Sequence, residues 1–326
     1  MKWRLRSACW QLLVIISCLL GNSNWVLAYS GNSLRSPLQV GTQVSRFGGK
    51  EVAAECSSPK SLPHKVEAVG FYTDPKASVI DKALYQRFLE LRKVITDEEE
   101  YLATLNTNYI LANKAVRVSI GQCLQSHLAR LAEDDVFTGS DDIRGGGAVR
   151  LMSITPILSY LLSREGSQTD LGADEKVRAW IDRLMGRLLS LEKNFRYENN
   201  IEDWTAAAFA LGAVALNRPE LLEHAVGVAR RKSEMVDTDG LLPLERQRGQ
   251  MAVDYSLSAI QALSIILVVA EANGTDLLSE PGGRGLIRMM RRMVLTINDP
   301  ASFLKFTDTP DAITSEHLDR QSMGWL

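Results

Sequence analysis

The stretch that decides the fold is residues 199–216, NNIEDWTAAAFALGAVAL. Its polar start leads into small and apolar residues on every side, and a helix of this kind lies in the interior of a protein. Residues 257–270 have the same character, whereas residues 175–191 and 219–234 carry one apolar and one polar face. Apolar helices that alternate with amphipathic ones predict two layers, an inner ring of helices wrapped by an outer one.

Helical patterns continue through most of the chain. A cap at Ser78, with Asp81 three residues later, precedes apolar residues at helical spacing from residue 84 to residue 95. Glycine stretches such as Gly145-Gly146-Gly147 are predicted to end helices. No stretch alternates polar and apolar residues with a period of two, so we expect an all-α fold. The further helices expected are residues 97–115, 117–134, 151–163, 203–216, 254–273 and 284–297.

The apolar run from residue 257 to residue 270 resembles a membrane span in composition. Ser258, Gln261 and Ser264 interrupt the run. The run is also shorter than the ~20 residues that cross a bilayer. We therefore expect it to be a buried core helix.

The first 28 residues have the pattern of an export signal. Lys2, Arg4 and Arg6 precede an apolar stretch at residues 12–20, and Val26-Leu27-Ala28 forms a small-residue cleavage site. Cleavage would give a periplasmic or secreted protein without a stable membrane anchor, and an uncleaved anchor is the alternative.

The mature chain is expected to divide into two parts. Residues 29–62, rich in Ser, Gly and Pro, predict an extended N-terminal arm, and residues 63–326 predict one helical domain. Without residues 1–28 the chain has 34 basic against 39 acidic residues, a net charge near −5. Such a chain is not a general binder of polyanions, so we expect no nucleic-acid partner, and an acidic ligand requires a local basic cluster. The sequence identifies no protein partner.

Two cysteines, Cys56 and Cys123, remain in the mature chain. An even number of cysteines in an exported protein predicts a disulfide. The alternative is two buried free thiols.

Three groups of polar residues are candidates for chemistry, and each also has a structural explanation. Asn199 and Asn200 precede a helix, where asparagine commonly caps free N–H groups. Arg246 and Arg248 follow the segment LPLE, where a solvated basic loop is the alternative. Tyr255 begins the apolar helix, where it could be a core tyrosine with a bonded hydroxyl.

Taken together, these residues resemble the periplasmic alginate (polymannuronate) lyases, polysaccharide lyase family five. The similarity extends from the Asn-Asn pair and Trp204 through residues 239–248, DGLLPLERQR, to Tyr255 and residues 270–277, AEANGTDL. It implies an incomplete α/α toroid whose open cleft is lined by the ends of inner helices. It also implies cleavage of uronate polysaccharides by β-elimination.

The residue types fit this chemistry. The C5 proton of a uronate becomes acidic when its carboxylate is neutralised, which the resemblance assigns to Asn200 and Arg248. A base removes that proton and an acid protonates the departing O4, and the resemblance assigns proton transfer to Tyr255. The further substrate contacts expected are Tyr72, on a loop over the cleft, and Asn199, Trp204 and Arg246.

The chain departs from the family pattern at three positions. The family's third motif residue is histidine, and Ile201 neither titrates nor donates a hydrogen bond. The histidine that often follows the catalytic tyrosine is Ser256, and the lysine before the loop tyrosine is Phe71.

Loss of the histidine leaves an acid–base role without its usual residue. In a mannuronate unit the C5 proton and O4 lie on the same face, so Tyr255 alone could be base and then acid if Arg248 lowers its pKa from about 10. Glu202 and Asp203 could substitute, although at a helix start they also fit as caps.

The sequence indicates no metal or cofactor. The histidines, His64, His127, His224 and His317, all lie outside the motif region, and no cluster has metal-ligand spacing. The glycine run at residues 145–147 follows no strand and lacks the Lys-Ser/Thr of a phosphate loop.

Three functions follow from the sequence. The first is an exported lyase acting on an acidic, uronate-containing polysaccharide. The second is a catalytically silent relative that binds anionic polysaccharide during its synthesis or export. The third is a helical scaffold for protein partners that keeps the motif for packing.

Overall fold

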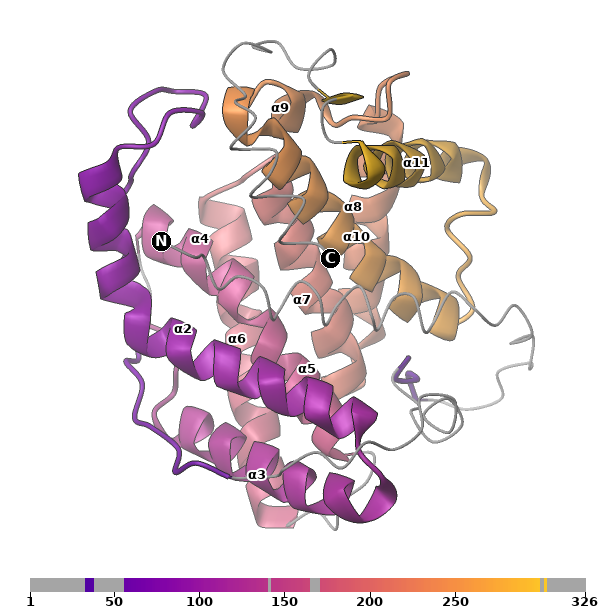
Figure 1. The fold of residues 1–326 in the computed structure, drawn as a ribbon. Helices are drawn as coiled ribbons and strands as arrows, with labels where there is room; N and C mark the ends of the chain where they lie inside the picture. Colours follow the sequence, from indigo (N-terminus) through magenta and orange to yellow (C-terminus); the bar gives the residue numbers. More distant parts are fainter. Residues whose placement is uncertain (1–32, 38–55, 140–141, 165–170, 300–301, 304–326) are drawn as a thin grey trace.

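Two apolar helices, α7 (Asn200–Leu216) and α10 (Ala252–Ala272), lie at the centre of the structure and pack against each other. The computed structural model describes residues 33–37, 56–139, 142–164, 171–299 and 302–303. The other helices surround this pair (Figure 1). They are α2 (Lys82–Leu111), α3 (Lys114–Glu133), α4 (Ile143–Met152), α5 (Ile154–Arg164), α6 (Leu171–Asn194), α8 (Pro219–Met235), α9 (Pro243–Arg246) and α11 (Arg284–Asn298).

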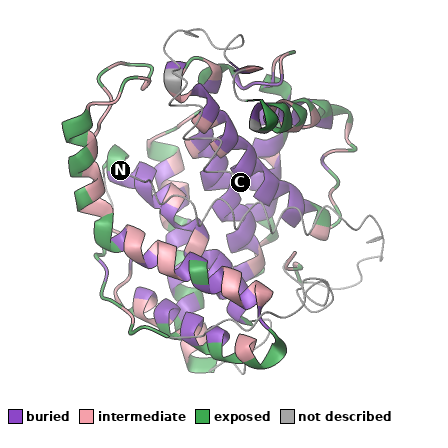
Figure 2. Ribbon diagram, viewed as in Figure 1, coloured by how far each residue is buried: buried purple, intermediate pink, exposed green. Residues whose placement is uncertain are grey.

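The burial pattern confirms the predicted alternation of apolar and amphipathic helices. Most residues of α7 and α10 are buried, whereas α6, α8 and α11 bury one face and expose the other (Figure 2). Within the described residues, α10 is the one helix long and apolar enough to cross a membrane. Because most of its residues are buried against the rest of the protein, it is a core helix, as expected.

Three details of the helix prediction are wrong. Residues 84–95 and 97–115 do not form separate helices, because α2 runs unbroken from Lys82 to Leu111 with Asp81 rather than Ser78 as its N-cap. The predicted helix 151–163 is divided at Ser153, where α4 ends and α5 begins.

The third error is the triple glycine, which lies inside α4 instead of ending a helix. A Cβ at Gly145 would collide with the Val66 carbonyl oxygen, and one at Gly146 would lie 2.7 Å from Leu191 Cδ2. These glycines are therefore required for close packing of α4, and the helix forms despite their low propensity.

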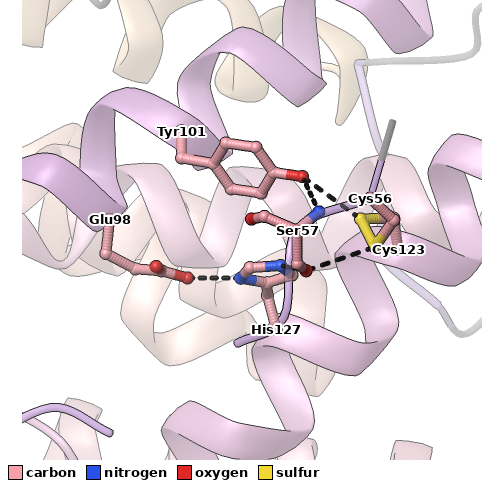
Figure 3. The surroundings of a disulfide bond; sticks show 6 residues. All are labelled: Cys56, Ser57, Glu98, Tyr101, Cys123 and His127. Atoms are coloured by element: carbon pink, nitrogen blue, oxygen red, sulfur yellow. Dashed lines mark hydrogen bonds and ion pairs between the residues drawn. A yellow bond between two sulfur atoms is a disulfide. The ribbon is translucent and has the colours of Figure 1, made fainter. Parts of the chain in front are cut away.

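The predicted disulfide between Cys56 and Cys123 is present and fixes the chain before α2 to α3 (Figure 3). The residues around it are closely bonded. Ser57 donates its N–H to the Tyr101 hydroxyl (2.8 Å), and the His127 ring bonds the Ser57 carbonyl (3.0 Å) and the Glu98 carboxylate.

The described parts of the N-terminal arm contain no helix or strand. Residues 33–37 lie against the C-terminal ends of the two central helices. Leu34 donates its N–H to Asn217 Oδ1 and Arg35 to Asn273 Oδ1, both at 2.8 Å. The predicted signal, residues 1–28, lies outside the described residues.

Candidate active site

Three of the predicted site residues come together although they are far apart in the sequence. The hydroxyl of Tyr72, on the loop before α2, forms a short hydrogen bond with the hydroxyl of Tyr255 on α10. The guanidinium carbon of Arg248 lies 3.9 Å from the centre of the Tyr255 ring and 5.6 Å from that of Tyr72. All three side chains are partly exposed, so a ligand can reach a cation and two phenols at one place.

Asn200 joins this group through Ser258, one helical turn after Tyr255 on α10. Asn200 Nδ2 lies 3.1 Å and Trp204 Nε1 lies 2.8 Å from Ser258 Oγ, while Asn200 Oδ1 is buried without a hydrogen-bond partner. An amide can take either orientation. If it turns, Ser258 donates to Asn200 Oδ1 and accepts from Trp204, and the Asn200 NH₂ group is left free to bind a carboxylate.

The structure gives the other predicted contacts internal roles. Asn199 Oδ1 accepts the Ile201 N–H at 3.0 Å and so caps α7. Arg246 Nη1 lies 2.9 Å from a carboxylate oxygen of both Asp237 and Asp239. Sugar binding by Asn199, Trp204 and Arg246 stays a prediction, while their present bonds hold the start of α7 and the loop before α9.

Beneath Asn200 lies a buried group of charges that we call the Lys232 cluster, formed by Glu202, Asp203, Lys232 and Glu245. Lys232, on α8, donates to the Glu198 carbonyl at 2.6 Å, and its ammonium lies 2.9 Å from Glu202 and 3.3 Å from Asp203. This lysine thus fixes the turn that begins α7. Sequence reasoning missed it, because position 232 reads as part of a solvated amphipathic face.

The carboxylates of this cluster are shielded from water. Burial raises the pKa of Asp203 to about 7, and the neighbouring Lys232 offsets only part of that rise. Burial likewise raises the pKa of Glu245, which accepts the Asn200 N–H at 2.7 Å. Glu202 and Asp203 are both buried, so neither occupies the exposed position that a direct replacement for the missing histidine would need.

A tyrosine mechanism requires Arg248 to lower the pKa of Tyr255, and the structure shows the opposite shift. Burial raises the pKa of the Tyr255 phenol, and Arg248 and the hydrogen bond from Tyr72 offset only part of that rise. The Tyr72 phenol also has a raised pKa, chiefly because of burial. Both phenols are therefore protonated near neutral pH.

A further wall of the site comes from α2, where Tyr85, Phe88 and Arg92 share one face. The Arg92 guanidinium carbon lies 4.8 Å from the Phe88 ring centre, and its buried Nε has no hydrogen-bond partner. Burial raises the pKa of the Tyr85 phenol, and the nearby Tyr255 adds to the rise. The spacing of three and four residues along α2 was the available sequence signal, but only the fold shows that this face approaches α10.

The position of the missing histidine is apolar. The Ile201 side chain is partly exposed, and its Cδ1 lies 4.0 Å from where a Cβ would stand on Gly147 of α4. The described histidines bond elsewhere: His64 to Asp135, His127 to Glu98 and His224 to Glu192. His317 lies outside the described residues.

One group in the described part of the chain has three potential metal ligands, Cys56, Cys123 and His127. The two cysteines are joined in a disulfide, and the His127 ring is bonded on both nitrogens. These atoms are therefore already committed and do not form a metal site.

Comparison with solved structures defines the fold. Alginate lyase A1-III from Sphingomonas species A1 has a TM-score of 0.64 and 17% identity, covering 94% of this chain and 82% of that one. A variant of that enzyme in complex with a tetrasaccharide has a TM-score of 0.67, with 95% and 82% covered. The fold is the α/α toroid of these polysaccharide lyases, as the sequence predicted.

Sequence comparison gives the family. The family model described as "Alginate lyase" matches residues 95–303, well over half of the chain. An alginate lyase of Pseudomonas syringae pv. tomato (strain ATCC BAA-871 / DC3000) is 26% identical over 261 residues, 78% of this chain and 68% of that protein. A polysaccharide lyase of Stenotrophomonas maltophilia (strain K279a) is 23% identical over 295 residues, 89% and 86%. The chain belongs to the alginate lyase family and is a polysaccharide lyase.

Proposed function

We propose that this lyase binds an acidic, alginate-type polysaccharide and cleaves it by β-elimination. The observation that carries the proposal is the Arg248 guanidinium beside the paired hydroxyls of Tyr72 and Tyr255. Asn200 and Arg248 bind the C6 carboxylate of one uronate unit, which makes its C5 proton more acidic. Tyr255 carries the proton.

The reaction balances without a cofactor or water. The C5–H and C4–O4 bonds break, a C4=C5 double bond forms, and the proton leaves C5 for the Tyr255 oxygen before it reaches O4. Because burial raises the pKa of Tyr255, only a small fraction of the enzyme holds the phenolate at neutral pH. Activity should therefore rise with pH into the alkaline range.

We also infer that the protein acts outside the cytoplasm. The basic, apolar and small-residue segments of residues 1–28 support export to the periplasm or the medium. The Cys56–Cys123 disulfide supports it too, because disulfides persist in oxidising compartments.

The test is ultraviolet absorbance of the unsaturated uronate product, with the mature protein on polymannuronate, polyguluronate and a neutral polysaccharide. Tyr255→Phe and Arg248→Ala should each lower the rate by roughly 10²–10⁴-fold. Tyr160→Phe is the control, because the Tyr160 hydroxyl bonds Asp174 away from the site (2.8 Å). Equal rates for wild type and Tyr255→Phe would contradict the role of Tyr255.

A second candidate function is binding without cleavage, and Ile201 is the observation that favours it. The variant Ile201→His separates the two functions. If the wild type is inactive and binds polyuronate through Arg248, and Ile201→His gains elimination, the natural protein is a binding member of the family. If the wild type is active, the tyrosine mechanism is sufficient.

A further inference from the structure

Helix α11 carries a basic surface that the active site does not use. It contains Arg284, Arg288, Arg291 and Arg292 and no acidic residue. The first three are exposed, and spacings of four and three residues place them on one face, at intervals of about 6 and about 4.5 Å along the axis. The opposite face buries Leu286, Met289 and Met293, and much of α11 is coloured as exposed in Figure 2. We call Arg284, Arg288 and Arg291 the α11 stripe.

Helix α11 is linked to the loop before α9 by hydrogen bonds. Arg288 donates to the Val236 carbonyl (2.9 Å), and Arg292 donates to the Asp239 carbonyl (2.8 Å). The Asp239 carboxylate holds Arg246, which precedes Arg248 by two residues. Figure 1 shows α9 and α11 at the same end of the molecule, and α11 packs on α8 and α10. Hydrogen bonds to residues 236–239 thus connect α11 with the segment that carries Arg246 and Arg248.

The local charge differs in sign from the charge of the chain. In this region the four arginines of α11 and Arg246 are countered by the carboxylates of Asp237 and Asp239, both of which pair with Arg246. Glu280 is paired with Arg230. The side chains of Arg284 and Arg291 form no hydrogen bond or ion pair with another described residue. The whole chain, by contrast, has a formal net charge of −2, so the excess of positive charge on α11 is a local feature that attracts polyanions.

We propose that the α11 stripe is a second binding surface for the anionic polysaccharide. It holds a stretch of polymer outside the candidate site while one uronate unit occupies Arg248 and Asn200. A long chain therefore binds more tightly than a short one, since the stripe adds contacts that a short oligosaccharide cannot reach. The identity of the polymer rests on the proposed function, but the stripe requires only binding and not cleavage.

The test compares long polymannuronate with a short oligomannuronate in titrations of the Tyr255→Phe protein, in which cleavage is suppressed. The double variant Arg284→Ser/Arg291→Ser should weaken binding of the long polymer roughly three- to tenfold, the sum expected for two exposed ionic contacts. Binding of the short oligosaccharide should be unchanged. The difference should disappear near 1 M NaCl, where the screening length is about 3 Å.

The control variant is Arg178→Ser/Lys193→Ser, which removes two exposed cations from α6. That helix packs on α3, α4 and α7 rather than on α11. Equal losses in the two double variants, or no loss in the α11 variant, would overturn the inference while leaving the proposed function intact. If the wild type neither binds nor cleaves any polyuronate, the proposed function is wrong, and the stripe has no such ligand.

Discussion

The molecule contains two buried polar clusters that are built in opposite ways. In the His127 cluster, formed by Ser57, Glu98, Tyr101 and His127, both ring nitrogens have partners and the Tyr101 hydroxyl accepts a backbone N–H (Figure 3). In the Lys232 cluster, both Asp203 oxygens and Glu245 Oε2 lack a hydrogen bond. Lys232 is 3.3 Å from Asp203, an ion-pair distance, but its hydrogen bonds go to backbone carbonyls.

This difference separates a structural role from a functional one. A fully bonded cluster beside a disulfide stabilises the fold at little cost, because each buried polar group has a partner. Buried carboxylate oxygens without a hydrogen bond are costly, and groups with shifted pKa values gather at functional sites. The Lys232 cluster lies directly under Asn200 and holds the start of α7 at the site. We therefore interpret the free-energy cost of its buried charges as a consequence of this positioning role.

The largest effect is expected from Lys232→Met. The variant keeps the length of the side chain but removes the ammonium beside Glu202 and Asp203. Asp203 is then buried without its cation, which should lower the free energy of unfolding by about 3–5 kcal/mol. Urea unfolding measures this. Arg231→Met is the control, because Arg231 is half exposed and also pairs with Glu202 (3.0 Å), so its loss should cost below about 1 kcal/mol. Similar losses in both variants would show that the Lys232 cluster has no special role.

The next effect concerns the other cluster. Replacing Cys56 and Cys123 together with alanine opens a crosslink between residues 67 apart and should lower the free energy of unfolding by about 2–4 kcal/mol. Polymer affinity should not change, because α3, which carries Cys123, lies at the opposite end of the molecule from α9 (Figure 1). A parallel loss of affinity would mean that the His127 cluster and the Lys232 cluster are coupled.

A third prediction uses pH. Burial raises the folded-state pKa of Asp203 to about 7, whereas in the unfolded chain it is about 3.9. Between these values the folded protein holds a proton that the unfolded chain has released. The contribution of Asp203 to stability is therefore present below pH ~4 and lost as pH rises to about 7, by at most about 1.4 kcal/mol per pH unit.

Asp203→Asn should flatten this dependence in urea unfolding measured across that range. Asp182→Asn, which removes an exposed carboxylate paired with Arg218 (2.8 Å), gives the effect of losing a surface charge. An unchanged slope in Asp203→Asn would show that Asp203 is ionised in the folded state throughout, and that the Lys232 cluster is better compensated than its hydrogen bonds indicate.

Much of the fold could be read from the sequence, because the period of apolar residues depends on local chain geometry. The apolar character of residues 205–216 and 257–270 placed α7 and α10 at the centre. The length of α2 and the helical triple glycine could not be read in this way. Both depend on contacts with distant residues, such as the Val66 carbonyl against Gly145.

In the candidate site too, the sequence predicted individual residues but not the contacts between distant ones. The resemblance to a known family selected Asn200, Arg248 and Tyr255, and it also placed Tyr72 on a loop over the site. No local pattern, however, predicts the contact between Tyr72 and Tyr255, which are 183 residues apart. The role of Lys232 was equally hidden, because its burial depends on where α8 meets the start of α7. Conversely, Asn199 caps α7 and Arg246 pairs with two aspartates, which are the ordinary roles that local sequence suggests for such residues.

The smallest effect is expected at Glu245, where the carboxylate has two separable functions. Its Oε1 accepts the Asn200 N–H at 2.7 Å, and its charge attracts Arg248 and Lys232. Glu245→Gln keeps the acceptor and removes the charge. The free energy of unfolding should change by less than about 1 kcal/mol, because a buried charge of raised pKa is lost with its hydrogen bond retained. Arg248 then has one anion fewer beside it, so affinity for polyuronate should rise by up to about threefold.

Glu245→Ala is the matched variant, since it removes the charge and the acceptor together. It leaves the buried Asn200 N–H unpaired, which should cost about 1–3 kcal/mol of stability. Because the amide of Asn200 is no longer held in place, affinity should fall rather than rise. Opposite shifts in affinity would show that the cluster holds Asn200 by its hydrogen bond while its charge restrains Arg248. A fall in affinity in both variants would mean that the Glu245 charge itself orders the site. The buried charge would then be required for binding, in spite of its cost in stability.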